Sequence, residues 1–404
     1  MNELKVLELF GGIGACTKAL ERLNIPHVVV DYVEIDKYAV KSFNAIHNTN
    51  FEPQDICEWD KDIEVDLIMH GSPCQDFSLA GKQAGGDEGS GTRSSLMYET
   101  IRIVEKLKPK YVIWENVKNL LSKKHRHNFA AYLKTMESLG YKNYYQVLNA
   151  KDYGIPQNRE RVFTVSILKE SIIYDDYNSN IRKDQDTIGT LTTNCGSSTI
   201  RNGWKIIEHN KHFEFPTKQE LKLKLKDMLE DEVDEKYYLS EKMINYIAAD
   251  NEKWTGNNHE SLINKTIAST INTAEGQRRC DASNYISNQF GENFDLKSRC
   301  VRLKSLIEKT NFEEGKALNM DLYNQTTNEN ISQCLTEPHH NTQRLFDGLR
   351  IRKLSPKEAF RLMGFDSKDF EKAAEVNSDS QLYKQAGNSI VVDVLIAIFK
   401  NLFI

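Results

Sequence analysis

The beginning of the chain combines a strand, a glycine turn, a helix and a second strand, and this order restricts the possible folds more than any other stretch. Residues 5–10 predict a strand, Gly11-Gly12-Ile13-Gly14 a tight turn, and the residues that follow, through Leu23, a helix. Residues 28–33 predict a second strand that leads into Glu34. This carboxylate follows the glycines by roughly 20 residues, the spacing at which Rossmann-like sites bind ribose hydroxyls. The pattern indicates an α/β fold with a nucleoside cofactor, although a tight turn without a ligand would also account for the glycines.

A single cysteine, Cys74, stands between an apolar run and a glycine-rich segment. The apolar run at residues 65–69 predicts a short buried strand, which places the thiol at a strand's carboxyl end, where open α/β sheets bind ligands. Residues 81–95 hold too many glycines for a helix or a strand interior and are predicted to form a mobile lid. A lone cysteine is more often a small buried apolar residue than a nucleophile. The case for catalysis therefore depends on its neighbours.

Three charged residues stand at the ends of other predicted strands. Residues 111–114 predict a buried strand that ends in Glu115, a candidate acid or base whose pKa burial would raise. A solvated strand end or a helix cap is the alternative interpretation. Arg159 and Arg161 open a strand predicted for residues 162–167, and residues two apart on a strand share one face. Such a pair suits an anionic or carbonyl-bearing ligand.

The alternation of strands and helices continues to about residue 170 and then fades. Helices are predicted at residues 96–107 and 127–139, and a strand at residues 144–148. In the middle of the chain, a capping box at residues 217–220 predicts a charged helix to about residue 229. Segments rich in Ser and Thr predict hairpin-like β structure; they are residues 187–193, 266–273 and 331–336. Basic patches at residues 278–279 and 297–304 are candidates for phosphate contacts, although solvated surfaces of this kind are more common.

The last part of the chain again predicts helices. Ser355-Pro356-Lys357-Glu358 is a capping box for a helix that ends before Gly364. An apolar helix is predicted for residues 390–402. Asn388 and Ser389 stand just before it, where either could simply be its N-cap.

Length and composition set broader limits. A chain of 404 residues exceeds the size at which one core stops growing, so two domains are expected. Seven cysteines without a closely spaced pair predict reduced thiols and no structural metal. No apolar run approaches a membrane span, and a cytosolic protein is expected. The net charge of −5 does not exclude nucleic acid, because the acidic excess gathers at residues 230–235 and a local basic face is what binding needs.

Taken together, six motifs resemble, in order and spacing, those of the cytosine-5 DNA methyltransferases. The motifs are Phe10-Gly11-Gly12-Ile13-Gly14, Pro73-Cys74-Gln75, Glu115-Asn116-Val117, Gln157-Asn158-Arg159-Glu160-Arg161, residues 352–365 and Gln385-Ala386-Gly387-Asn388-Ser389. The resemblance covers about residues 4–168 and 349–404. Asp76 departs from it, because many relatives carry an uncharged residue at that position.

The resemblance implies a Rossmann-like methyltransferase domain, dependent on S-adenosyl-L-methionine, with a second, smaller and irregular β-rich recognition domain. Residues 1–168 would form the catalytic domain, residues 169–348 the target-recognition domain, and residues 349–404 a segment that returns to complete the catalytic domain. Glu34 would bind the ribose hydroxyls of the cofactor, Ile35 its adenine and Asp55 the adenine amino group. The full set implied for cofactor binding is Phe10, Gly12, Gly14, Glu34, Ile35, Asp55, Ile56, Pro73, Leu96 and Asn388.

The implied reaction is methylation of carbon 5 of a flipped cytosine in double-stranded DNA. Cys74 would add to carbon 6, a protonated Glu115 would serve ring nitrogen 3, and Arg161 would hold the base oxygen. Arg159 would support the thiolate or a nearby phosphate. The nearest alternative is a tRNA cytosine-5 methyltransferase, whose recognition region is much shorter. A nicotinamide-linked dehydrogenase would leave Cys74 and Glu115 without roles, and a monomer would suffice for any of these functions.

Overall fold

The computed structural model describes residues 3–73, 96–175, 204–209, 212–238, 318–321, 326–329, 332–333, 343–346 and 351–404. Several predictions concern residues outside these ranges. They include the expected nucleophile Cys74, the lid predicted for residues 81–95, two of the three Ser/Thr-rich segments, and both basic patches of the middle region.

A six-stranded sheet forms the centre of the molecule, with the strand order β2-β1-β3-β4-β7-β5. The strands are β1 (Leu4–Leu9), β2 (His27–Val33), β3 (Leu67–His70), β4 (Tyr111–Val117), β5 (Tyr141–Asn149) and β7 (Glu160–Leu168). The first four are parallel, and β7 runs antiparallel to both β4 and β5. Buried apolar residues occupy both faces of the parallel strands, as expected for strands that are covered on both sides.

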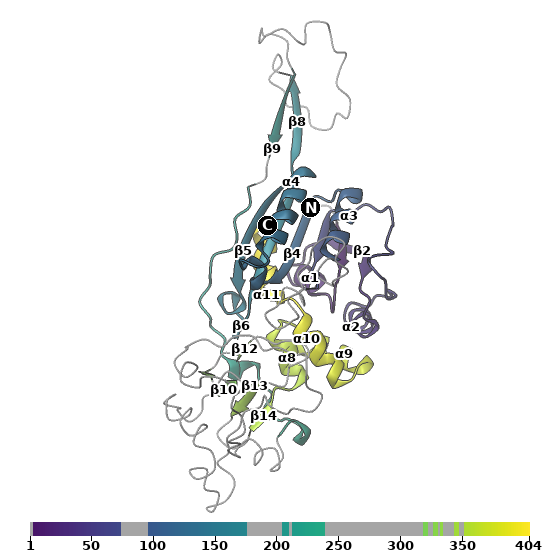
Figure 1. Ribbon diagram of the computed structural model, residues 1–404. Coiled ribbons are helices and arrows are strands. Elements are labelled where there is room, and N and C mark those ends of the chain that lie inside the picture. The colour runs from purple at the N-terminus through teal and green to yellow at the C-terminus, as the bar shows by residue number, and fades with distance from the viewer. Residues whose placement is uncertain are drawn as a thin grey trace, which may run out of the picture.

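Helices cover both faces of this sheet (Figure 1). On one face, Val6 and Ile113 pack in a core with α1 (Ala15–Arg22) and α11 (Val392–Phe403). On the other face, Leu7 and Trp114 pack with α3 (Met97–Leu107) and α4 (Arg126–Ser138). Adjacent strand residues thus enter different cores, because side chains alternate across a strand. The result is a three-layer α/β/α arrangement in which the last helix of the chain packs against the first.

Four further helices lie at the edge of the sheet next to β2 and below it in Figure 1. They are α2 (Lys37–His47), α8 (Pro356–Leu362), α9 (Ser367–Val376) and α10 (Asp379–Asn388). Helix α2 packs on the outer strand through Phe43, whose ring stacks on Tyr32 of β2, and α9 packs on α2. The predicted capping box of α8 is confirmed, since Ser355 and Glu358 bond each other's backbone N–H groups.

Short strands of the middle region form small separate sheets. An antiparallel sheet has the order β11-β10-β13-β14 and consists of β10 (Leu318–Asp321), β11 (Thr326–Glu329), β13 (Gln343–Phe346) and β14 (Ile351–Lys353). A two-stranded hairpin of β8 (Glu170–Asp175) and β9 (Trp204–His209) extends from the opposite end of the central sheet (Figure 1). Within residues 331–336, the described strand β12 (Ser332–Gln333) confirms β structure for these two residues, but it pairs in parallel with β6 (Gln157–Asn158) and not as a hairpin.

The helix predicted for residues 217–229 is also wrong. Residues 212–224 have no helical structure, and only the 3₁₀ turns η4 (Leu225–Met228) and η5 (Glu235–Tyr237) follow. The backbone of this segment accepts hydrogen bonds from residues around the central sheet instead: Tyr153 donates to the Pro216 carbonyl at 3.0 Å, and Arg361 donates to the Leu229 carbonyl at 3.0 Å. Tertiary contacts of this kind override the local preference of a charged segment for a helix.

One stretch among the described residues, Asp379–Phe403, is long and apolar enough to cross a membrane by length and composition alone. It consists of α10 and α11, which are separated at residues 389–391, and 67% of its most apolar window is buried. Leu395, Ile398 and Phe399 of α11 have no exposed surface and belong to the core shared with α1. The stretch therefore has the packing of a core element of the α/β fold.

Candidate active site

Three of the four parallel strands end at one register position, beside Trp114 of the longer strand β4, and this alignment creates the site. Val33 of β2, Leu9 of β1, His70 of β3 and Trp114 of β4 are register partners across the sheet. The next residues along the four chains are Glu34, Phe10, Gly71 and Glu115. Three of these four are predicted site residues, and the fourth begins the segment that leads to Cys74. Ligands of open α/β sheets bind at this carboxyl edge.

The glycine turn has the left-handed backbone that its sequence predicts. Phe10, Gly12 and Gly14 have φ angles of 54°, 57° and 81°. The two glycines serve different purposes. A Cβ added to Gly14 would lie 2.4 Å from His47 Nε2 and 2.7 Å from Phe43, so Gly14 is required for packing against α2. A Cβ added to Gly12 would meet nothing within 4 Å, so this glycine borders open space beside the strand ends.

Glu34 closes one side of this space. Its carboxylate accepts hydrogen bonds from the backbone N–H of Gly12 at 3.2 Å and of Asp36 at 2.9 Å. Burial raises the pKa of Glu34, and these two N–H groups oppose the rise. Ile35, next along the chain, is an apolar side chain that is 68% exposed. A hydrogen-bonding carboxylate beside an exposed apolar side chain suits the ribose and base of a nucleoside.

The segment after α2 reaches the same place. Gln54 donates its backbone N–H to the Glu34 carbonyl at 2.9 Å, which brings Asp55 and Ile56 next to Glu34 in space. Asp55 is exposed and accepts from the Cys57 N–H at 2.9 Å. The side chain of Ile56 is buried in the core with α3, so only its backbone faces the site region. Leu96, at the N-cap of α3, packs at the border of that same core.

Helix α10 docks against the start of α2 and carries Asn388 to the site. Lys384 forms an ion pair with Asp36 at 2.8 Å, and Gln385 donates to the Tyr38 carbonyl at 2.9 Å. Asn388 is exposed and is the last residue of α10. The N-cap of α11 is Val391, so the alternative that Asn388 caps the following helix is wrong.

Arg159 and Arg161 contact different parts of the site. Arg159 is 4% exposed, and its Nη2 donates to the Gly387 carbonyl at 3.1 Å and the Ser389 carbonyl at 2.8 Å. Arg161 lies opposite the end of β4, and its Nε forms an ion pair of 3.1 Å with Glu115. Arg159 therefore holds the backbone on both sides of Asn388, whereas Arg161 pairs with the carboxyl group of Glu115.

Glu115 lies inside β4, which continues two residues beyond it because β7 pairs with the strand as far as Val117. Glu115 is buried, with 9% of the residue's surface exposed, and burial raises the pKa of its carboxyl group, opposed by Arg161 and Arg159. A Cβ added to Gly71 would lie 3.9 Å from Glu115 Oε2 and 3.8 Å from Ile390. The ends of β3 and β4 and the returning C-terminal segment thus meet at this carboxyl group.

The residues that lead to Cys74 are fixed by β4. Trp114 donates its indole N–H to Ser72 Oγ at 3.0 Å, and Asn116 donates its side-chain amide to the Ser72 carbonyl at 3.3 Å. Pro73, the last residue described before Cys74, is half-buried. The expected nucleophile itself lies outside the described residues.

Three residues that support this site were not predicted from the sequence. They are Trp114, Lys384 and His70. His70 is fully buried, stacks on Trp114 with an interplanar angle of 6°, and lies 3.2 Å from the Tyr132 hydroxyl. Burial lowers its pKa to about 3, so it is neutral near neutral pH. The position of His70 directly before Gly71 could have indicated that it lies near the site. Lys384 had no such signal in the sequence, because its partner Asp36 lies 348 residues away.

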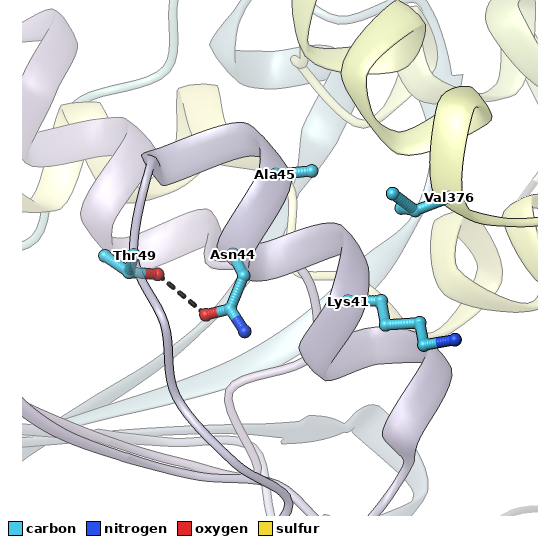
Figure 2. A pocket seen from close by; sticks show the side chains of 5 residues that line it. All are labelled: Lys41, Asn44, Ala45, Thr49 and Val376. Carbon is cyan, nitrogen blue, oxygen red and sulfur yellow. Dashed lines mark hydrogen bonds between the residues drawn. The ribbon is translucent and has the colours of Figure 1, made fainter.

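A hollow on the outer side of α2 is separate from this constellation. It has a volume of about 480 Å³ and is lined by Lys41, Asn44, Ala45, Thr49 and Val376 (Figure 2). Thr49 donates to the Asn44 side chain at 2.9 Å across its rim. It contains none of the predicted site residues. Among the described residues, no group of three His, Cys, Asp or Glu side chains could hold a metal ion.

Comparisons with known proteins agree with this arrangement. The sequence model of the family described as C-5 cytosine-specific DNA methylase matches residues 4–403. The type II methyltransferase M2.ScrFI of Lactococcus lactis subsp. cremoris is 30% identical, with 99% of each chain covered. The orphan methyltransferase M.SPRI of Bacillus phage SPR is 31% identical, with 100% of this chain and 98% of the relative covered.

Solved structures give the same fold. The methyltransferase EhMeth of Entamoeba histolytica aligns with a TM-score of 0.55 at 17% identity, covering 100% of this chain and 98% of the other. Dnmt2 of S. pombe aligns with a TM-score of 0.52 at 17% identity, covering 100% of both chains. These matches confirm the Rossmann-like methyltransferase fold predicted from the sequence.

Proposed function

Because the chain belongs to the family of C-5 cytosine-specific DNA methylases, we propose that it transfers a methyl group from S-adenosyl-L-methionine to carbon 5 of a cytosine within a specific sequence of duplex DNA. The observation that carries the proposal is the row of aligned strand ends. It places Glu34 and the glycine turn at one end and Glu115 at the other, with the segment leading to Cys74 between them. A cofactor and a base bound at this edge would lie side by side.

The described residues fit the cofactor. The Glu34 carboxylate is oriented by two backbone N–H groups and would accept hydrogen bonds from the ribose hydroxyls. Ile35 offers exposed apolar surface to the adenine, and Asp55 lies near enough along the chain to serve its amino group. The open space beside Gly12 leaves room for the rest of the molecule. When bound, the cofactor supplies an electrophilic methyl group.

The residues around Glu115 fit the base. The Cys74 thiolate would add to carbon 6 of cytosine, which makes carbon 5 nucleophilic enough to accept the methyl group. Glu115, with its raised pKa, would hold a proton at ring nitrogen 3 as electron density shifts there. Arg161 would bind the base oxygen and stabilise the adduct. Loss of the carbon 5 proton and release of Cys74 would then yield 5-methylcytosine.

Arg159 is assigned a positioning role in this scheme. Its side chain is buried and donates to the carbonyls of Gly387 and Ser389, which supports a function in holding Asn388 at the cofactor. We also keep the division into a catalytic part at residues 1–168, a recognition part at residues 169–348 and a returning segment at residues 349–404. Within the recognition part, residues 212–238 pack on the catalytic body, so contacts with DNA bases are expected from other segments.

Cytosine atoms are not accessible inside a duplex, so the target base would have to flip out, which takes a few kcal/mol. The curated relatives that match along their whole length are bacterial and phage methyltransferases. We therefore place the protein in the cytoplasm of a bacterial cell, acting as a monomer.

The test is expression in cells that lack DNA cytosine methylation, followed by digestion of their DNA and mass spectrometry of the nucleosides. We expect 5-methylcytosine in DNA from cells with the wild-type chain and none with Cys74→Ser, which should still bind the cofactor. Methylation with Cys74→Ser would refute the nucleophile assignment. Modified cytosine in tRNA but not in DNA would replace the DNA proposal with the tRNA alternative.

A further inference from the structure

A run of basic residues directly follows the strand that carries Glu115. Residues 118–127, here called the basic segment, read Lys-Asn-Leu-Leu-Ser-Lys-Lys-His-Arg-His and contain no Asp or Glu. The side chains of Lys123, Lys124, Arg126 and His127 are exposed, while His125 is buried and anchors the run. The reaction assigned to the site uses none of them.

The basic segment lies at the same edge of the sheet as the candidate active site. Strand β4 ends at Val117, which pairs with Arg161, and the 3₁₀ turn η2 (Lys118–Leu121) follows at once. Lys118 forms an ion pair of 2.9 Å with Glu160, the first residue of β7. The backbone N–H of Arg126 then bonds the Ser122 carbonyl at 2.9 Å and begins α4. The exposed charges thus follow Glu115 by 8 to 12 residues, and ordered structure holds them at the edge of the sheet where β4 ends.

Local electrostatics make this position unusual. The charges surround the N-terminus of α4, and its first turn contains no acidic residue. The N-terminal end of a helix already carries a partial positive charge, so acidic residues are favoured there and basic ones are disfavoured. Lys118 is paired with Glu160, and the exposed side chains of Lys123 and Arg126 add positive charge near the same helix end. The outcome is a concentrated positive potential at the rim of the site, which attracts anions.

We propose that Lys123, Lys124 and Arg126 bind phosphates of the DNA backbone next to the target cytosine. The inference rests on the proposed function, since it takes a DNA duplex as the ligand. It adds a phosphate-binding surface on the catalytic part of the chain, separate from any contact made by residues 169–348. The surface positions the duplex over Glu115 without reading its sequence.

The test compares two triple variants. The patch variant is Lys123→Gln, Lys124→Gln and Arg126→Gln, and the control variant is Lys41→Gln, Lys134→Gln and Lys368→Gln. The control removes the same charge from exposed positions elsewhere, one of them farther along α4. Binding to a 30-base-pair duplex of mixed sequence is measured by fluorescence anisotropy at several KCl concentrations. Binding of S-adenosylhomocysteine, measured by calorimetry, checks that each variant is folded.

Each lost phosphate contact lowers the slope of log affinity against log salt by ~0.9. We therefore expect the slope of the patch variant to be smaller than that of the wild type by about 2.7. Between 50 and 200 mM salt, the patch variant should then lose roughly 40-fold less affinity than the wild type. The control variant should keep the wild-type slope, and all three proteins should bind the cofactor product equally.

Equal slopes for the patch and control variants, with duplex binding intact, would overturn the phosphate surface and leave the proposed function standing. Absence of duplex binding by the wild type would overturn both. If the patch variant lost affinity for tRNA but not for duplex DNA, the ligand would be RNA and the proposal would be wrong.

Discussion

Removal of the hydrogen bond between Trp114 and Ser72 should slow the reaction without weakening cofactor binding. The indole N–H donates to Ser72 Oγ at 3.0 Å, and the two residues are 1% and 3% exposed. Ser72 stands two residues before Cys74. The bond therefore fixes the backbone segment that leads to this proposed nucleophile. Asn116 still holds the Ser72 carbonyl at 3.3 Å in either variant. The effect should therefore be partial rather than complete.

The magnitude follows from burial. Ser72→Ala leaves the Trp114 N–H buried without its acceptor, which destabilises the fold by about 1–3 kcal/mol. Trp114→Phe removes the donor and part of the ring, which adds a cavity contribution of similar size. Because both changes break the same bond, the double variant should be more stable than their sum predicts by ~1 kcal/mol. If that energy also positions Cys74 in the transition state, the rate falls roughly fivefold.

The measurements are urea unfolding and single-turnover methyl transfer to DNA that lacks cytosine methylation. Ser166→Ala is the matched control, because Ser166 is buried in the same sheet and donates to Asn143 at 2.6 Å near the amino end of β4, away from the carboxyl edge that forms the site. It should lower stability but leave the rate unchanged. Strictly additive losses for Ser72 and Trp114, or a rate for Ser72→Ala equal to that of Ser166→Ala, would refute the reasoning.

Three other predictions follow from the site. Burial raises the pKa of Glu115, so the rate should fall as pH rises through that pKa; Glu115→Gln should remove this dependence and slow the reaction by roughly 10²–10⁴. The folded state binds more protons than the unfolded state between the ordinary and the raised pKa, so stability should also fall with rising pH there, and less so in the variant. Arg159→Gln removes two charge-assisted bonds and should weaken cofactor binding by roughly tenfold or more, measured by calorimetry. Gly14→Ala should lower stability by at least ~2 kcal/mol because of backbone strain and the clash with His47, whereas Gly12→Ala should lower stability through backbone strain alone, by about 1–2 kcal/mol, and should also weaken cofactor binding.

Each of these has an outcome that would contradict it. An unchanged pH profile in Glu115→Gln would show that another group holds the proton. Normal cofactor affinity in Arg159→Gln would separate the C-terminal segment from the cofactor site. If Gly12→Ala unfolded the protein while Gly14→Ala bound cofactor normally, the distinction between the two glycines would be wrong.

The sequence predicted the central sheet well because its strands are short apolar runs bounded by glycine, proline or charge. Residues 28–33 and 111–114 are such runs, and both lie in strands within three residues of the predicted ends. Glu115 belongs to its strand rather than to the loop beyond it, because the partner strand extends the pairing to Val117. That extension depends on β7, which is distant in sequence and leaves no local signal.

The helix predicted after residue 217 failed for the same kind of reason. A capping box describes only local preference, while the donors of this segment bond elsewhere; the Gln219 N–H, for example, bonds the Asp152 carbonyl at 2.9 Å. Within the site, the residue types predicted which side chains were candidates for function, but they did not predict the hydrogen-bond partners of those side chains. Two hydrogen bonds illustrate this, one from Trp114 to Ser72 and one from Arg159 to Gly387. Each joins segments that come together only in the complete fold.

The hydrogen bond from Arg159 to the Gly387 carbonyl also has a consequence for folding during synthesis. Gly387 follows Arg159 by 228 residues. At synthesis rates of ~5–20 residues per second, roughly 10–45 s pass on the ribosome between the two ends of this contact. During that time α1 also lacks α11, the helix that covers it. A nascent chain can therefore begin to build its sheet, but it acquires a complete site only after translation of its last helices.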